Sequence, residues 1–323
     1  MLTAPIPHGG ALAEAMVRYG GSRADWLDLS TGINPWAYPV PELDAAAWQR
    51  LPEQSAVDAL ERAAREAYGV HDRHAIVAAP GTQALIQALP IAIARANVSI
   101  VAPTYGEHEF VWRAHGHTVR RVREPEGADV LVIVNPNNPD GRDWSADRLE
   151  NHARKLLIVD EAFRDPSPGR SLAQAPGDRI VVLRSFGKFF GLAGLRLGFA
   201  VGGAGPVERL RELLGPWSVS GPACHIGRVA LEDGAWQRAT RTQLRAASER
   251  LAAFLTDHGF AVVGGTELFV TAERSGAPSI RERLCRARIL VRAFDYEPGW
   301  LRFGLPPDDA AYRRLSIALR SDG

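Results

Sequence analysis

The chain has 323 residues, enough for one large domain with a smaller companion. Its 38 Lys and Arg residues nearly balance its 37 Asp and Glu residues, which argues against a broad basic surface for nucleic acid or for an anionic membrane. Two cysteines, Cys224 and Cys285, are too few for a disulfide framework or a thiolate metal site, and no run of apolar residues is long enough to span a bilayer, so we expect a cytoplasmic protein without a metal.

The first predicted elements are a helix near residues 11–19 and a turn at Asn34-Pro35. The sequence His8-Gly9-Gly10 precedes this helix. A capped helix and a turn ended by proline account for both stretches without any ligand. An amphipathic helix is predicted at residues 55–68, where apolar side chains recur on one face.

A short apolar strand at residues 75–79 ends in Pro80-Gly81, and a helix is predicted to begin at Thr82. The unpaired backbone amides and the dipole of a helix N-terminus both favour an anion, so Gly81 and Thr82 are candidates for phosphate binding. A plain helix cap at Thr82 is the alternative.

Three further strands are nearly continuous apolar runs, which is typical of strands buried in a parallel sheet. They are predicted at residues 98–102, 129–134 and 156–159. Asp160 follows the last of them directly, and the carboxyl ends of strands are where α/β sheets place groups that bind ligands. Asp160 is therefore a candidate site residue.

Lys188 lies among four glycines in the stretch RSFGKFFGLAGLRLG, residues 184–198, directly after the predicted strand at 180–183. Glycines allow the backbone to approach a ligand closely, and a desolvated lysine can become a nucleophile toward a carbonyl carbon. Lys188 is thus a Schiff-base candidate. A lysine in an ordinary surface loop is the alternative.

The remainder begins with a connector rich in helix breakers at residues 215–222, followed by a long helix near 235–258 and then alternating strands and helices. Arg292 and Arg302 each belong to a predicted apolar strand, where a guanidinium is costly unless it is paired. Substrate binding and structural ion pairs with nearby carboxylates are both open readings of these arginines.

The pattern Ser185-x-x-Lys188, followed eight residues later by Arg196 within Gly-x-Arg-x-Gly, resembles the lysine signature of fold-type I pyridoxal phosphate enzymes. The turn NPNNPDG, residues 135–141, resembles the NPNNPTG of that superfamily. Two further motifs are the N-terminal His-Gly-Gly and the sequence Pro-Trp-Ser-Val at 216–219. With all of these motifs, the chain most resembles the threonine-phosphate decarboxylases of the cobalamin pathway.

The resemblance implies a role for each matching residue. Lys188 would bind the aldehyde of pyridoxal 5'-phosphate, and Asp160 would pair with the pyridine nitrogen. The other cofactor-binding residues that it implies are Gly81, Thr82, Ser185 and Arg196 at the phosphate, Tyr105 stacked on the ring, and Asn138 at the phenolic oxygen. The implied substrate-binding residues are His8, Asn34, Arg292 and Arg302.

Three positions depart from the pattern of the relatives. Asp140 replaces a threonine in the turn, where aspartate is also favourable. Phe163 replaces a tyrosine that bonds the phenolic oxygen in many relatives. Leu51 replaces a tyrosine that in relatives often reaches the cofactor phosphate of the neighbouring subunit. The resemblance implies a homodimer, but whether the neighbouring subunit contributes to the site is left open.

The alternation of strands and helices predicts an α/β fold with a mostly parallel sheet flanked by helices, and the resemblance to fold-type I enzymes implies that this sheet has seven strands. We expect residues 35–215 to form the large cofactor-binding domain, and residues 1–34 and 216–323 to form a smaller α+β domain. The expected reaction is decarboxylation of L-threonine O-3-phosphate to (R)-1-amino-2-propanol O-2-phosphate. An aminotransferase of the histidinol-phosphate type is the alternative.

Overall fold

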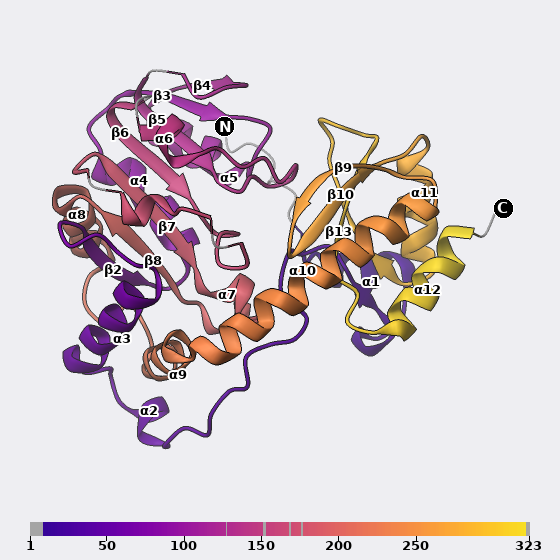
Figure 1. The fold of residues 1–323 in the computed structure, drawn as a ribbon, viewed down its shortest axis with the longest axis horizontal. Coiled ribbons are helices and arrows are strands. Elements are labelled where there is room, and N and C mark those ends of the chain that lie inside the picture. Colours follow the sequence, from indigo (N-terminus) through magenta and orange to yellow (C-terminus); the bar gives the residue numbers. More distant parts are fainter. Residues whose placement is uncertain (1–8, 127, 151–152, 168, 176, 321–323) are drawn as a thin grey trace. The chain divides into compact units, whose positions relative to one another are not determined.

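The computed structural model describes residues 9–126, 128–150, 153–167, 169–175 and 177–320. By its contacts the chain divides into two compact units (Figure 1). The larger unit comprises Ala37–Asn138 and Arg142–Ala239, and the smaller comprises Met1–Trp36, Pro139–Gly141 and Thr240–Gly323. Residues 216–239, which the sequence analysis assigned to the small domain, belong to the larger unit by this division.

A seven-stranded sheet forms the centre of the larger unit. Its strands, in spatial order, are β2 (Ala75–Ala79), β8 (Gly198–Gly202), β7 (Ile180–Ser185), β6 (Ala153–Asp160), β5 (Ala128–Val134), β3 (Asn97–Val101) and β4 (Thr118–Val122). Only β8 is antiparallel to its neighbours, β2 and β7. The predicted fold class, a mostly parallel seven-stranded sheet flanked by helices, is confirmed.

The strands of this sheet contact α3 (Gln54–Ala67), α4 (Thr82–Ala92), α5 (Glu107–Ala114), α6 (Ala146–Glu150), α7 (Phe186–Phe189) and α8 (Ala204–Leu214) (Figure 1). Outside them, α9 (Gly221–Glu232) packs on α3, and the short α2 (Ala46–Gln49) packs on α9. Apolar side chains of α4, α5 and α8 form one core with alternate residues of the strands, because successive strand residues point to opposite faces. That core includes Ile158 and Leu183, so Asp160 and Ser185, each two residues further on, belong to the same face.

The smaller unit has an antiparallel sheet in the order β12 (Arg292–Ala293), β13 (Trp300–Gly304), β10 (Phe269–Glu273) and β9 (Ala261–Thr266). A parallel pair, β1 (Leu27–Asp28) with β11 (Ile289–Leu290), ties its N-terminal segment to the later residues. Its helices are α1 (Leu12–Tyr19), α11 (Ala277–Arg286) and α12 (Asp309–Arg320), and α10 (Gly234–Asp257) begins in the larger unit and ends here. No helix among the described residues is long and apolar enough to cross a membrane.

Candidate active site

Lys188 lies in α7, the single helical turn that follows β7 directly. Its Nζ is 5.7 Å from the centroid of the Phe163 ring, which belongs to the segment after β6. The neighbouring residue Gly187 cannot be replaced without displacement, because a Cβ atom there would lie 2.7 Å from Cα of Ala193. The glycines of this loop thus allow the chain to fold back on itself around the lysine.

The sheet register brings the predicted phosphate-binding residues together. Gly198 of β8 pairs with Ser185 of β7 on one side and with Ala79 of β2 on the other, so the turn after β2 lies close to Ser185. A Cβ atom on Gly198 would lie 2.7 Å from the backbone nitrogen of Thr82, where α4 begins.

Arg196 completes this corner of the sheet. A Cβ atom on Gly81 would lie 2.5 Å from Nη2 of Arg196. Gly81 has φ +83° and Arg196 has φ +54°, a left-handed conformation that is uncommon for a residue with a side chain. Backbone amides at a helix start, a hydroxyl and a guanidinium converge here, and together they can bind a phosphate group.

Asp160 ends β6 and is buried. Its Oδ2 lies 3.0 Å from Nε2 of His108, a fully buried side chain of α5, and its Oδ1 accepts a hydrogen bond of 3.0 Å from the backbone N–H of Ala162. His108 was not predicted from the sequence. The one available signal is that it follows Tyr105 by three residues where a helix begins, and in the structure the two ring centroids lie 6.1 Å apart, edge to face.

Tyr105 and Asn138 are placed by the loops that follow β3 and β5. The hydroxyl of Tyr105 donates to Oε1 of Gln83 at 3.1 Å, and burial raises the pKa of the phenol above its usual range. Asn137 joins the two loops, since its Nδ2 donates to the carbonyl of Pro103 at 2.9 Å and its Oδ1 accepts from Oγ1 of Thr104 at 2.7 Å. The half-buried Asn138 follows directly.

In the smaller unit, Arg292 and Arg302 occupy directly opposed positions of β12 and β13. Nη2 of Arg302 donates to the carbonyl of Ser30 at 2.7 Å, and its Cζ lies 5.0 Å from the centroid of the Phe269 ring. Burial, and then the charge of Arg292, lower the pKa of Arg302 to about 10, and burial likewise lowers the pKa of Arg292. Two guanidinium groups so placed favour the binding of anions.

The N-terminal segment surrounds Arg302. A Cβ atom on Gly9 would lie 2.4 Å from the carbonyl oxygen of Ser30 and 3.5 Å from Nη2 of Arg302. Asn34 is buried, and its Oδ1 accepts a hydrogen bond of 2.9 Å from the backbone N–H of Trp36. His8 lies outside the described residues. The structure thus groups Asn34, Arg292 and Arg302 in one unit and the cofactor candidates in the other. Among the described residues, no three metal-ligating side chains cluster.

Comparison with known proteins agrees with this geometry. Residues 25–315 match the family model described as "Aminotransferase class I and II". The chain is 46% identical to a threonine-phosphate decarboxylase of Pseudomonas aeruginosa, with 97% of each chain covered, and 45% identical to one of Sinorhizobium sp., with 98% of each covered. A solved histidinol-phosphate aminotransferase from Sinorhizobium meliloti, in complex with pyridoxal-5'-phosphate, shares the fold with a TM-score of 0.81 at 20% identity, over 98% of this chain and 94% of that one.

Proposed function

Because the chain belongs to the aminotransferase class I and II family, we propose that it is a pyridoxal phosphate enzyme that decarboxylates L-threonine O-3-phosphate. The observation that carries this proposal is identity of 45–46% over nearly the whole chain to two proteins named threonine-phosphate decarboxylase. The product would be (R)-1-amino-2-propanol O-2-phosphate, and its use in cobalamin biosynthesis is part of the proposal. Appearance of this product, followed by phosphorus NMR, tests it.

The residues of the larger unit fit pyridoxal phosphate. A methyl group on Gly81 or Gly198 would fill the corner between Arg196 and the start of α4, which supports a phosphate site at that corner. Asp160, hydrogen-bonded to His108, is a buried carboxylate suited to a protonated ring nitrogen. The residues that would hold the cofactor are Lys188 at the aldehyde, Gly81, Thr82, Ser185 and Arg196 at the phosphate, Asp160 at the ring nitrogen, Asn138 at the phenolic oxygen and Tyr105 on the ring face.

When bound, the cofactor supplies an electron sink for the pair left on Cα as carbon dioxide departs. Lys188 would hold the cofactor aldehyde, and its ε-amine would deliver a proton to Cα of the substrate. Asp160 would pair with the protonated ring nitrogen, and His108 holds the Asp160 carboxylate in place. Phe163 lies against Lys188 without offering a hydroxyl group, so Asn138 alone would contact the phenolic oxygen.

We propose that Arg292 and Arg302 bind the phosphate and the carboxylate of the substrate, with Asn34 and His8 beside them. The way in which Arg302 would orient the substrate carboxylate is what would separate loss of carbon dioxide from the transamination of a histidinol-phosphate aminotransferase.

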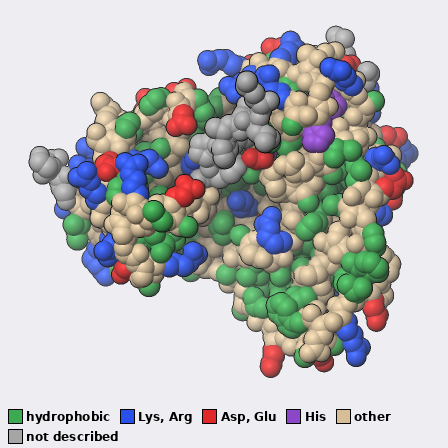
Figure 2. All heavy atoms as spheres, turned by 180° about the vertical axis from the view of Figure 1, so that it is seen from behind, with side chains coloured by type: hydrophobic (Ala, Val, Ile, Leu, Met, Phe, Trp, Pro, Cys, Tyr) green, Lys and Arg blue, Asp and Glu red, His purple; other side chains and the backbone are tan. Residues whose placement is uncertain are grey.

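We further propose that the enzyme is a cytoplasmic homodimer. Both cysteines, Cys224 and Cys285, are buried free thiols, as expected in a reducing compartment. Large apolar side chains of the larger unit are exposed, with 69% of Trp48, 64% of Leu51 and 61% of Trp217 accessible. Figure 2 shows hydrophobic side chains gathered on the lower right, over the part of this unit that carries α2, α3 and α9. A second copy of the chain would cover such a surface.

A further inference from the structure

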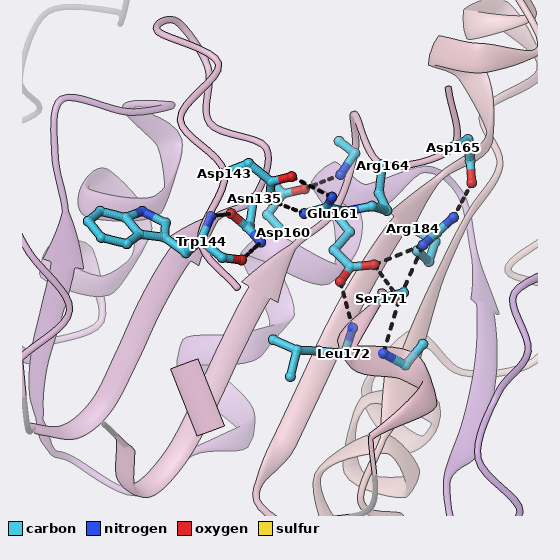
Figure 3. A network of polar contacts seen from close by, with 12 residues as sticks. Asn135, Asp143, Trp144, Asp160, Glu161, Arg164, Asp165, Ser171, Leu172 and Arg184 are labelled. Atoms are coloured by element: carbon cyan, nitrogen blue, oxygen red, sulfur yellow. Dashed lines mark hydrogen bonds and ion pairs between the residues drawn. The ribbon is translucent and has the colours of Figure 1, made fainter. Parts of the chain in front are cut away.

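A buried network of charged side chains lies directly behind the proposed cofactor site (Figure 3). Arg184 is its centre, with 5% of its surface accessible. Nη1 of Arg184 donates to Oε2 of Glu161 at 2.8 Å, and Nη2 forms a short ion pair with Asp165. Its Cζ lies 4.3 Å from the centroid of the Tyr68 ring, so the guanidinium is enclosed on its face as well.

Glu161 is bound equally tightly. Its Oε2 accepts from Oγ of Ser171 at 2.5 Å, and its Oε1 accepts from the backbone N–H of Leu172 at 2.9 Å. Burial disfavours the charged form of Arg184, but the carboxylates of Asp165 and Glu161 more than offset this, and its pKa is raised. Arg184 therefore stays charged at any ordinary pH.

The place of this network in the sheet connects it to the site. The register of β6 with β7 ends at Asp160 opposite Leu183, and the next bond runs from the backbone N–H of Glu161 to the carbonyl of Leu183 at 2.9 Å. The backbone pairing of β6 with β7 ends here, and the next link between the two segments is the side-chain hydrogen bond from Arg184 to Glu161. The strand ends are thus joined by side chains where the backbone ladder stops.

The proposed cofactor ligands are the residues next to Glu161 and Arg184 in the chain, on the opposite face of the sheet. Asp160 precedes Glu161, and Ser185 follows Arg184, so each ligand alternates with a member of the network along its strand. Holding Glu161 and Arg184 together therefore also holds Asp160 at a set distance from Ser185 and from the loop of Lys188. One guanidinium shared by two carboxylates leaves a formal charge of −1 in the interior, and a buried ion network of this kind is a weak source of stability.

We propose that Arg184 is a positioning residue of the cofactor site, which acts by binding Glu161 and Asp165 behind the ends of β6 and β7. It touches neither cofactor nor substrate. Its effect is to fix the carboxylate of Asp160 relative to Ser185 and Lys188. This inference rests on the proposed function, since it concerns the residues to which pyridoxal phosphate would bind.

Arg164 provides a matched control (Figure 3). It is equally buried, with 4% accessible, but it forms its ion pair with one partly exposed carboxylate, Asp143, at 2.8 Å and 2.5 Å. Replacing either arginine by methionine removes one buried guanidinium of the same size. Only Arg184→Met should remove the side-chain link between the ends of β6 and β7.

The experiment measures the Kd of pyridoxal phosphate for the cofactor-free forms of the wild type, Arg184→Met, Arg184→Lys and Arg164→Met, together with their melting temperatures and the kcat and KM for L-threonine phosphate. We expect Arg184→Met to raise the Kd about 10- to 100-fold and to lower kcat of the cofactor-saturated enzyme by a similar factor, with KM within twofold. Arg184→Lys, which keeps the charge but cannot bridge two carboxylates as a planar fork, should lie between. Arg164→Met should bind the cofactor within twofold of the wild type.

A Kd for Arg184→Met within twofold of the wild type would overturn the inference, as would equal losses of affinity in Arg184→Met and Arg164→Met. If Arg184→Met does not fold, Arg184→Lys decides the matter, because wild-type affinity in that variant at a lowered melting temperature would reduce the network to a purely structural role. Failure of the wild type itself to bind pyridoxal phosphate would instead refute the proposed function.

Discussion

Arg292 and Arg302 stand directly opposite each other on neighbouring antiparallel strands, and the pKa of Arg302 is lowered to about 10. Like charges at opposed positions of a sheet destabilise the fold. Under the proposed function, the phosphate and the carboxylate of the substrate would offset this cost, because each would pair with one of the two guanidinium groups.

The first prediction concerns Arg302→Met. We expect kcat/KM for L-threonine phosphate to fall by at least about 100-fold. The free energy of unfolding of the ligand-free protein should change by at most about 2 kcal/mol, because removal of the buried charge opposes loss of the hydrogen bond to Ser30. Thermal unfolding and steady-state kinetics measure the two effects. A strongly destabilised variant would indicate that Arg302 is a structural ion pair.

The same lowered pKa predicts a pH dependence. The pKa of Arg302 in the folded protein is about 10, below the ordinary value of an arginine, so above about pH 10 the unfolded chain holds the proton more tightly. Stability linked to this group therefore rises as the pH rises above about 10, and the full penalty is present below it. The stability of Arg302→Met relative to the wild type should accordingly fall above about pH 10, and a difference that stays constant with pH would contradict the assignment.

The second prediction tests the proposed phosphate site beside Gly81 and Arg196 by adding a single methyl group. Gly81 and Gly116 have nearly equal φ values of +83° and +80°, but a Cβ atom meets Arg196 at Gly81 and nothing within 4 Å at Gly116. Both alanine variants should lose about 1 kcal/mol of stability from backbone strain. Only Gly81→Ala should also weaken pyridoxal phosphate binding, by at least about tenfold, as measured by titration of the cofactor-free protein. Equal affinities would refute a phosphate site at this corner.

The third prediction concerns His108, whose Nε2 lies 3.0 Å from Asp160. His108→Phe leaves Asp160 without this partner, and we expect kcat to fall about 10- to 100-fold. The visible absorption of the bound cofactor should also change its pH dependence, since Asp160 no longer holds the ring nitrogen as firmly. His115→Phe, at the exposed end of the same helix, is the control and should leave both unchanged.

The fourth prediction concerns assembly. Trp48→Glu places a charge in the exposed apolar surface of the larger unit, and we expect the dimer to dissociate at micromolar concentration because an isolated charge is costly to bury. Light scattering coupled to size exclusion gives the mass. Val17→Glu, at a still more exposed position on α1 of the smaller unit, should remain dimeric. A wild-type mass of one chain would refute the homodimer.

Most strands of the larger unit were predictable, because a strand that is buried on both faces is a continuous apolar run. The edge strand β4 was missed, since Arg120 and Arg121 interrupt its apolar pattern and edge strands tolerate charge. Strand β8 was missed as well, although it is buried, because its short apolar run begins and ends with glycine. Helix α9 was read in part as a connector because Gly221 and Pro222 begin it. It packs on α3, which assigns residues after 215 to the larger unit.

The candidate site residues could be identified from motifs, but their partners could not. A single histidine such as His108 has no pattern that separates a buried partner of Asp160 from a surface residue. Arg184 and Glu161 likewise read as ordinary charged residues, because only the pairing of β6 with β7 brings them together. The opposition of Arg292 and Arg302 is a matter of register, and single strands do not reveal their register.

The most direct test of the account compares two reactions of the same cofactor-loaded protein. One sample receives L-threonine phosphate, the other receives histidinol phosphate with 2-oxoglutarate, and carbon dioxide and glutamate are followed in both. We predict carbon dioxide from the first sample, abolished by Lys188→Ala, and no glutamate from the second. Glutamate from the second sample without carbon dioxide from the first would contradict the account and identify an aminotransferase.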